Sequence, residues 1–223
     1  MAEAICSDVL GFTNVRNYVS YEACRINGFS GCRSKNFLDA KSEAFVSLGS
    51  AFRFSYGADL SNKVYTYRNA DDRIRFVIDF VYEFTGLDCT EYLCTILNFD
   101  MLVLNTDRHF YNMGFIKSDS GYRFAPIFDN GAALLSNMSV FPPDKSVEDN
   151  IDSAVSKPFC GSFERQALVL GSNLKIDYEG LVPYIETVSH FRVKEVLRLQ
   201  VDRYKNYFPA LNEISFPKTA KKP

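Results

Sequence analysis

One stretch, residues 104–131, constrains the fold of this chain more than any other. It follows a long apolar segment and carries two runs of strand-forming residues, 111–117 and 122–128. Between them lies the turn-favouring sequence Ser-Asp-Ser-Gly at 118–121. Strand-like runs on either side of such a turn predict a β-hairpin, and a hairpin brings its two outer ends back together.

Three oxygen-bearing side chains surround this predicted hairpin. Asp107 precedes its first strand, Asn112 follows five positions later near the outer end of that strand, and Asp129 directly follows its second strand. We therefore expect Asn112 and Asp129 to face one point, with Asp107 just outside. Carboxylate and amide oxygens suit Mg²⁺ rather than zinc. Asp, Asn and Gly also favour turns for local reasons, so a polar hairpin without chemistry is the alternative.

The same order of residues occurs in phosphoryl-transfer enzymes. A protein kinase uses an Asp that accepts the substrate hydroxyl proton, an Asn five residues later on a metal, and an Asp-x-Gly whose Asp also holds the metal. Here Asp107, Asn112 and the Asp129 of a D-N-G sequence stand in those places. The ordered set indicates a phosphoryl-transfer site. We expect His109 to brace the loop rather than act as a base.

The sequence NTDRHFYNMG, followed after the first strand by APIFDNGA, resembles the catalytic segment of HipA-like serine/threonine kinases. That family has a kinase-like fold and often belongs to bacterial toxin–antitoxin systems. The resemblance extends over about residues 3–208 and is highly specific over 105–131. It implies a catalytic role for Asp107 and Mg²⁺-binding roles for Asn112 and Asp129, with ATP as phosphate donor and a protein as substrate.

The resemblance also implies positions for ATP. Asn36 lies in a segment near the hinge between lobes, where backbone groups meet adenine, and Lys157, in the sequence S-K-P-F, could approach phosphate. A solvated surface lysine is the alternative for Lys157. Glu3 corresponds to the Glu that pairs with the ATP-binding Lys of a kinase. Since the sequence offers it no partner, we expect Glu3 to be a solvated charge near a helix N-terminus.

A kinase carries its Gly-rich loop and its ATP-binding Lys before the Glu-bearing helix. Here that helix is predicted to begin at Ala2, which leaves no room for them. The sequence therefore predicts a kinase that lacks the front of its N-lobe. It would be truncated, completed by an N-lobe partner chain, or decayed to a pseudokinase that serves as an interaction module. An antitoxin is the other partner that the resemblance implies. Another phosphotransferase, such as an aminoglycoside or lipid kinase, is a further alternative.

Composition limits the class of protein. Apolar residues make up 47% of the 223-residue chain, which is typical of a globular protein. A net charge of -2 gives no reason to expect direct nucleic-acid binding. The six cysteines form no C-x-x-C pair and there are two histidines, so a zinc site is not expected. We expect reduced cysteines in a cytoplasmic protein, and no apolar run is long enough to span a membrane.

The periodicity of apolar residues predicts an α+β fold, mostly α, and the resemblance to HipA-like kinases implies that it is a kinase-like C-lobe with a partial, truncated N-lobe. A helix at 2–12 and two strands, 15–24 and 29–37, joined by an Asn-Gly turn, form the N-lobe in residues 1–40. Residues 41–211 form a mainly helical catalytic lobe, and residues 212–223 a basic tail.

Within the catalytic lobe, helices at 69–85 and 88–104 are predicted to pack together, with the hairpin on their C-terminal ends. Further helices are expected at 42–48, 162–170, 177–188 and 193–207. Residues 53–67 fit no regular element, and residues 138–158 are expected to form a long loop beside the site.

Overall fold

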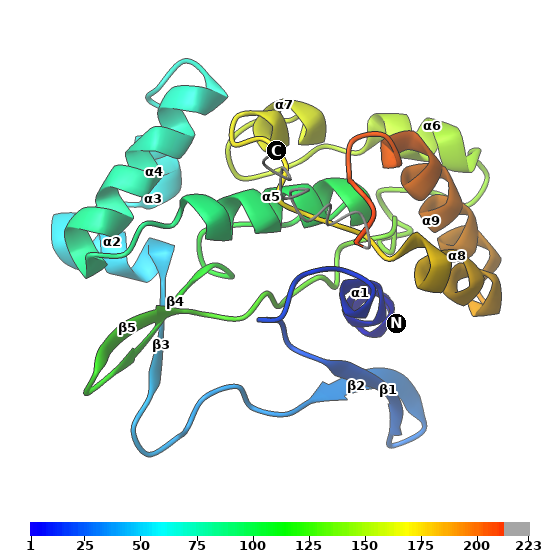
Figure 1. The fold of residues 1–223 in the computed structure, drawn as a ribbon, viewed down its shortest axis with the longest axis horizontal. Coiled ribbons are helices and arrows are strands. Elements are labelled where there is room, and N and C mark those ends of the chain that lie inside the picture. Colours follow the sequence, from blue (N-terminus) through cyan, green and yellow to red (C-terminus); the bar gives the residue numbers. More distant parts are fainter. Residues whose placement is uncertain (212–223) are drawn as a thin grey trace, which may run out of the picture.

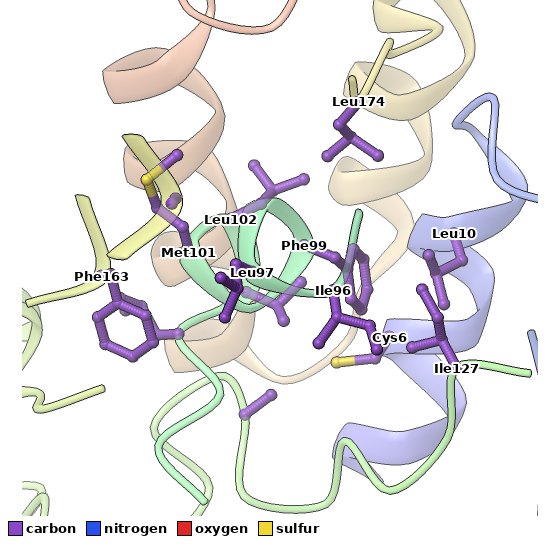
Figure 2. Packing of buried hydrophobic residues seen from close by; sticks show 14 of the residues in the cluster. Cys6, Leu10, Ile96, Leu97, Phe99, Met101, Leu102, Ile127, Phe163 and Leu174 are labelled. Carbon is purple, nitrogen blue, oxygen red and sulfur yellow. The ribbon is translucent and has the colours of Figure 1, made fainter. Parts of the chain in front are cut away.

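The structure, a computed structural model, describes residues 1–211. The helix α5 (Thr90–Val103) runs through the middle of the molecule. Every residue of α5 from Ile96 to Val103 is buried, as its apolar character on most sides predicts. Figure 2 shows α5 close to its axis, with Ile96 and Phe99 on the side of Cys6 and Leu10. Those two residues belong to α1 (Ala2–Gly11). The core therefore forms around α5.

The architecture is mixed α+β and mostly helical, as predicted, with two small sheets on one side of the helices (Figure 1). α4 (Ala70–Thr85) begins where the Asn69 side chain accepts a hydrogen bond from the Asp72 N–H at 2.8 Å. It ends at Gly86, whose φ of 75° suits glycine. The predicted tail, 212–223, lies outside the described residues.

The C-terminal helices also follow the sequence prediction. They are α7 (Phe163–Leu168), α8 (Tyr178–Thr187) and α9 (Phe191–Tyr204). The predicted pairing of α4 with α5 is wrong, because α5 packs mainly against α7 and α9. α4 instead lies against α7 and two helices that the sequence analysis did not predict, α2 (Leu48–Tyr56) and α3 (Leu60–Val64). α3 and the end of α2 fall in residues 53–67, for which no element was predicted.

The predicted Asn-Gly turn joins β1 (Tyr21–Ile26) to β2 (Phe29–Ser34) in an antiparallel hairpin. Asn27 and Gly28 both have positive φ, 52° and 83°, as a two-residue hairpin turn requires. The first strand begins later than predicted. The residues before it run beside the segment that leads to Asp129, where the Val19 N–H donates to the Ile127 carbonyl at 2.9 Å.

The second predicted hairpin is also present, with shorter strands, β4 (Gly114–Ser118) and β5 (Gly121–Phe124). The helix predicted at 42–48 is wrong, because β3 (Ala44–Ser47) pairs with β4 in a sheet of order β3-β4-β5. The sheet lies against the C-terminal end of α4 and the first turn of α5, not against the C-terminal end of both helices. Phe84 of α4 stacks on Phe115, and Tyr92 of α5 stacks on Phe124.

The predicted loop at 138–158 contains α6 (Val147–Ser153), which begins at Ser146, whose hydroxyl oxygen accepts a hydrogen bond from the Asp149 N–H. Across residues 1–211, no helix has both the length and the apolar character needed to cross a membrane.

Gly114 opens β4 at a point where β3 leaves no room for a side chain. A Cβ there would lie 2.2 Å from the Val46 carbonyl oxygen and 2.8 Å from the Ser47 Cα. We expect Gly114→Ala to lower the free energy of unfolding by about 1–3 kcal/mol, because the strands must separate. Urea unfolding measures the loss. Gly31→Ala in β2, where a Cβ meets open space, is the matched control, and an equal loss in both variants would contradict the prediction.

Candidate active site

The loop between α5 and β4 is held at its start by side chains. Leu104 has a φ of 55° and ends α5. The Asn105 side chain then donates to the Asp100 carboxylate at 3.1 Å and accepts from the Asp107 N–H at 3.3 Å. The hydroxyl of Thr106 donates to the Ala132 carbonyl at 3.2 Å. The loop is thus tied to α5 and to the segment that follows Asp129.

Arg108 makes the strongest connection in this region. Its guanidinium donates two hydrogen bonds to the Asp100 carboxylate, both at 2.8 Å, and neither side chain is exposed. It also donates to the Phe128 carbonyl at 2.8 Å and to the Asn130 side-chain oxygen at 2.7 Å. The sequence analysis missed Arg108. The residue in the sequence that could have pointed to Arg108 is Asp100, because a carboxylate inside an apolar helix needs a buried partner.

These connections bring Asn112 and Asp129 together, as the hairpin geometry predicted. The Asn112 Nδ2 lies 3.3 Å from the Asp129 Oδ2, and the Asn112 Oδ1 accepts a hydrogen bond from the His109 N–H at 3.0 Å. Asn112 is buried and Asp129 is exposed. Asp129 has a φ of 60°, an uncommon conformation for a residue with a side chain. Such backbone outliers are frequent at functional sites.

His109 supports the loop, as we expected. Its Nδ1 accepts a hydrogen bond from the Tyr111 N–H at 3.3 Å, so the ring is engaged within its own loop. The Tyr111 ring in turn lies against Gly49, where an added Cβ would come within 2.8 Å of a ring carbon.

Asp107 points outward and meets Lys157. The Lys157 Nζ lies 2.8 Å from the Asp107 Oδ1, and each side chain is about half exposed, at 53% and 56%. The loop that carries Lys157 is firmly held: the buried Gln166 side chain donates to the Lys157 carbonyl at 2.9 Å, and Arg73 donates to the Phe159 carbonyl at 2.6 Å. Lys157 is therefore as exposed as the alternative, a solvated surface lysine, predicts. Unlike such a lysine, it is paired with a carboxylate.

Glu3 reaches the same region from α1. Its carboxylate accepts a hydrogen bond from the Asn130 N–H at 3.0 Å. Burial raises the pKa of Glu3, the bond from Asn130 opposes that rise, and the negative charge of Asp129 adds to it. Burial, with Glu3 nearby, also raises the pKa of Tyr21 to about 12. The expectation that Glu3 is a solvated charge is wrong, because α1 packs its first turn against residues 130–131.

Asn36 is exposed, and its side chain accepts a hydrogen bond from the Leu38 N–H at 3.1 Å. It lines a cavity of about 640 Å³ beside Tyr18 and Val19. The neighbouring Phe37 ring packs on Phe128, with ring centroids 5.5 Å apart. The segment therefore lies next to the residue that precedes Asp129, and the nucleotide-binding role of Asn36 stays a prediction.

The donor set fits a hard cation that keeps part of its shell for substrate and water. Within residues 1–211, no group of three or more His, Cys, Asp or Glu side chains is arranged to hold a metal ion. The side-chain oxygens of Asn112 and Asp129 are the groups that would hold the cation; here the Asn112 Oδ1 accepts a hydrogen bond from the His109 N–H, and its Nδ2 faces Asp129. Mg²⁺ in proteins typically takes one or two such ligands and completes its shell with phosphate and water oxygens.

Comparison with known proteins places the fold. No protein-family model matches the chain, and no curated protein matches its sequence. Among solved structures, the chain is similar to a Helicobacter pylori proinflammatory kinase, CtkA, with a TM-score of 0.59 and 15% sequence identity. The match covers 93% of this chain and 79% of that chain. At this identity the similarity concerns the fold alone, which this chain shares with that structure over the matched residues.

Proposed function

We propose that this protein is a HipA-like kinase that transfers the γ-phosphate of ATP to a Ser or Thr hydroxyl of a protein. The observation that carries the proposal is the meeting of Asn112 and Asp129 at 3.3 Å, on the segments that flank one hairpin. Asp107 lies on the same loop as Asn112, with its carboxylate half exposed. This order of residues is the one used in phosphoryl transfer by protein kinases, which supports the proposal.

Each side chain has a role in the proposed reaction. Asn112 and Asp129 would hold Mg²⁺, which would supply neutralisation of the phosphate charge. Asp107 orients the substrate hydroxyl and accepts its proton as the oxygen bonds to the γ-phosphorus and the bond to ADP breaks. Lys157, 2.8 Å from Asp107, offsets the negative charge that gathers between Asp107 and the phosphate. The backbone around Asn36 is proposed to bind adenine.

The resemblance to HipA-like kinases extends this proposal to a cytoplasmic bacterial toxin restrained by an antitoxin, or to a kinase whose N-lobe a partner chain completes. One observation favours a second candidate, a kinase-like interaction module without catalysis. In a kinase the Glu of this helix pairs with the ATP-binding Lys. Across residues 1–211 Glu3 forms no ion pair and accepts a hydrogen bond from the Asn130 backbone instead.

The test compares wild-type protein with Asp129→Asn in γ-labelled ATP, with and without Mg²⁺, and follows label transferred to the protein itself or to a generic Ser/Thr substrate protein. Calorimetry measures ATP binding in parallel. We expect Mg²⁺-dependent transfer by wild type and its loss in Asp129→Asn. Asp119→Asn, in the exposed hairpin turn, is the matched control. Equal transfer by all three proteins would refute the assigned site. Absence of both transfer and Mg²⁺-dependent ATP binding would favour the interaction module.

A further inference from the structure

Arg192, in the first turn of α9, has no hydrogen-bond partner among residues 1–211, although all three nitrogens of its guanidinium are buried. It also forms no ion pair with any of these residues. Burying a charged group without a partner is costly, because the charge loses its hydration. The Nδ1 of the neighbouring His190 is likewise buried without a partner in this part of the chain. The start of α9 thus carries two side chains, His190 and Arg192, whose buried nitrogens have no hydrogen-bond partner among residues 1–211.

These two residues line a cavity of about 800 Å³ that shares no lining residue with the candidate active site. The cavity lies between the segment that leads into α6 and the turn between α8 and α9, two regions that are neighbours in Figure 1. Lys145, Ser146 and Ser189 also line it. We refer to it as the α6–α9 cavity. Lys145, Ser146 and Ser189 bring hydrogen-bond donors to its lining.

The charge around the α6–α9 cavity favours an anion. Lys145 and Arg192 carry two positive charges, and the N-terminus of α9 adds a partial positive charge with free backbone N–H groups. The N-cap residue of α9, His190, makes no side-chain capping bond. Two carboxylates, Glu148 and Glu195, also line the cavity, and Arg198, which lies 3.5 Å from Glu195, is held more closely by Glu186 at 2.5 Å. The side-chain charges of the lining therefore balance, and the α9 N-terminus gives the cavity its partial positive charge.

We propose that the α6–α9 cavity binds a phosphate monoester. A guanidinium presents N–H donors in a planar fork that matches the oxygens of phosphate. A dianion with three terminal oxygens can engage Arg192, Lys145 and the α9 N-terminus together, which a carboxylate cannot. Met138 and Phe191 add exposed apolar walls, at 53% and 74% exposure, that suit the neighbours of a phosphorylated residue. This site does not depend on the proposed kinase activity.

The test measures thermal unfolding of the whole chain with three probes at matched ionic strength: inorganic phosphate, a phosphoserine tripeptide with leucine on either side, and the same tripeptide without phosphate. At about tenfold excess over its dissociation constant, a bound probe raises Tm by about 3–6 °C. We expect this rise with both phosphorylated probes and none with the third. A larger affinity for the tripeptide identifies a phosphorylated protein segment as the source, and equal affinities identify a small phosphate compound.

Arg192→Met is the decisive variant, because it keeps the apolar stem and removes the charge. We expect it to abolish the phosphate response and, without phosphate, to leave Tm unchanged or higher, since an unpaired buried charge is gone. Arg203→Met, on the same helix, and Lys157→Met, at the candidate active site, should keep the response. Glu148→Gln should strengthen it.

Three results would overturn the proposal. One is the absence of any rise in Tm with phosphorylated probes. Another is a rise that persists in Arg192→Met but disappears in Lys157→Met, which would place phosphate at the candidate active site. The third is a lower Tm of Arg192→Met without phosphate, which would mean that a partner within the protein already holds the guanidinium.

Discussion

Asp107→Asn is expected to lower kcat for phosphoryl transfer about 10²- to 10⁴-fold, with little change in KM for ATP. The amide has nearly the same shape as the carboxylate but cannot accept the hydroxyl proton of the substrate. It also loses the ion pair with Lys157, whose Nζ lies 2.8 Å from the Asp107 Oδ1. Steady-state kinetics of labelled phosphate transfer, at varied ATP, separates kcat from KM.

Asp144→Asn is the control for this prediction, because Asp144 is an exposed aspartate outside the site. It should match the wild type in both constants. If Asp107→Asn kept its kcat, or if its whole loss lay in KM, Asp107 would not be the group that accepts the proton.

Arg108→Met is expected to lower the free energy of unfolding by about 3–5 kcal/mol, the typical result of removing one partner of a buried ion pair. The variant leaves the Asp100 carboxylate fully buried without its two bonds of 2.8 Å. It also frees the Phe128 carbonyl and the Asn130 side chain, both near Asp129. Urea unfolding, followed by circular dichroism, measures the loss.

The double variant Asp100→Leu/Arg108→Met should recover much of that stability, because no uncompensated charge then remains in the core. Arg198→Met is the surface control. Arg198 pairs with Glu186 on the surface, where both side chains are about half exposed, and such pairs contribute about 0–1 kcal/mol. Similar losses in Arg108→Met and Arg198→Met would show that burial of the Arg108 pair has no special energetic weight.

Local signals in the sequence predicted the elements that depend on neighbouring residues. The Asn-Gly turn, the cap at Asn69 and the stop at Gly86 act within a few residues, and the structure has each of them. The strand β3 was mistaken for a helix because its partner, β4, lies far along the chain. Nothing within Ala44–Ser47 itself distinguishes a short strand from a short helix.

The candidate site divides in the same way. The spacing of Asp107, Asn112 and Asp129 was visible because one hairpin brings the last two together. Glu3 was misjudged because its partner, the Asn130 N–H, is 127 positions away. Gln166 was missed since a buried glutamine that holds one backbone carbonyl leaves no pattern in the sequence. Contacts of this kind depend on the whole fold rather than on local periodicity.

The anchoring of Lys157 has a consequence for how the protein is made. Chains fold progressively as they leave the ribosome, and Asp107, Asn112 and Asp129 emerge before Lys157. The hydrogen bond that holds the Lys157 carbonyl comes from Gln166, which emerges later still. A nascent chain that ends between Asp129 and Lys157 therefore carries both carboxylates without the lysine that pairs with Asp107. The charge balance around Asp107 is completed only after Lys157 and the residue that anchors it, Gln166, have emerged.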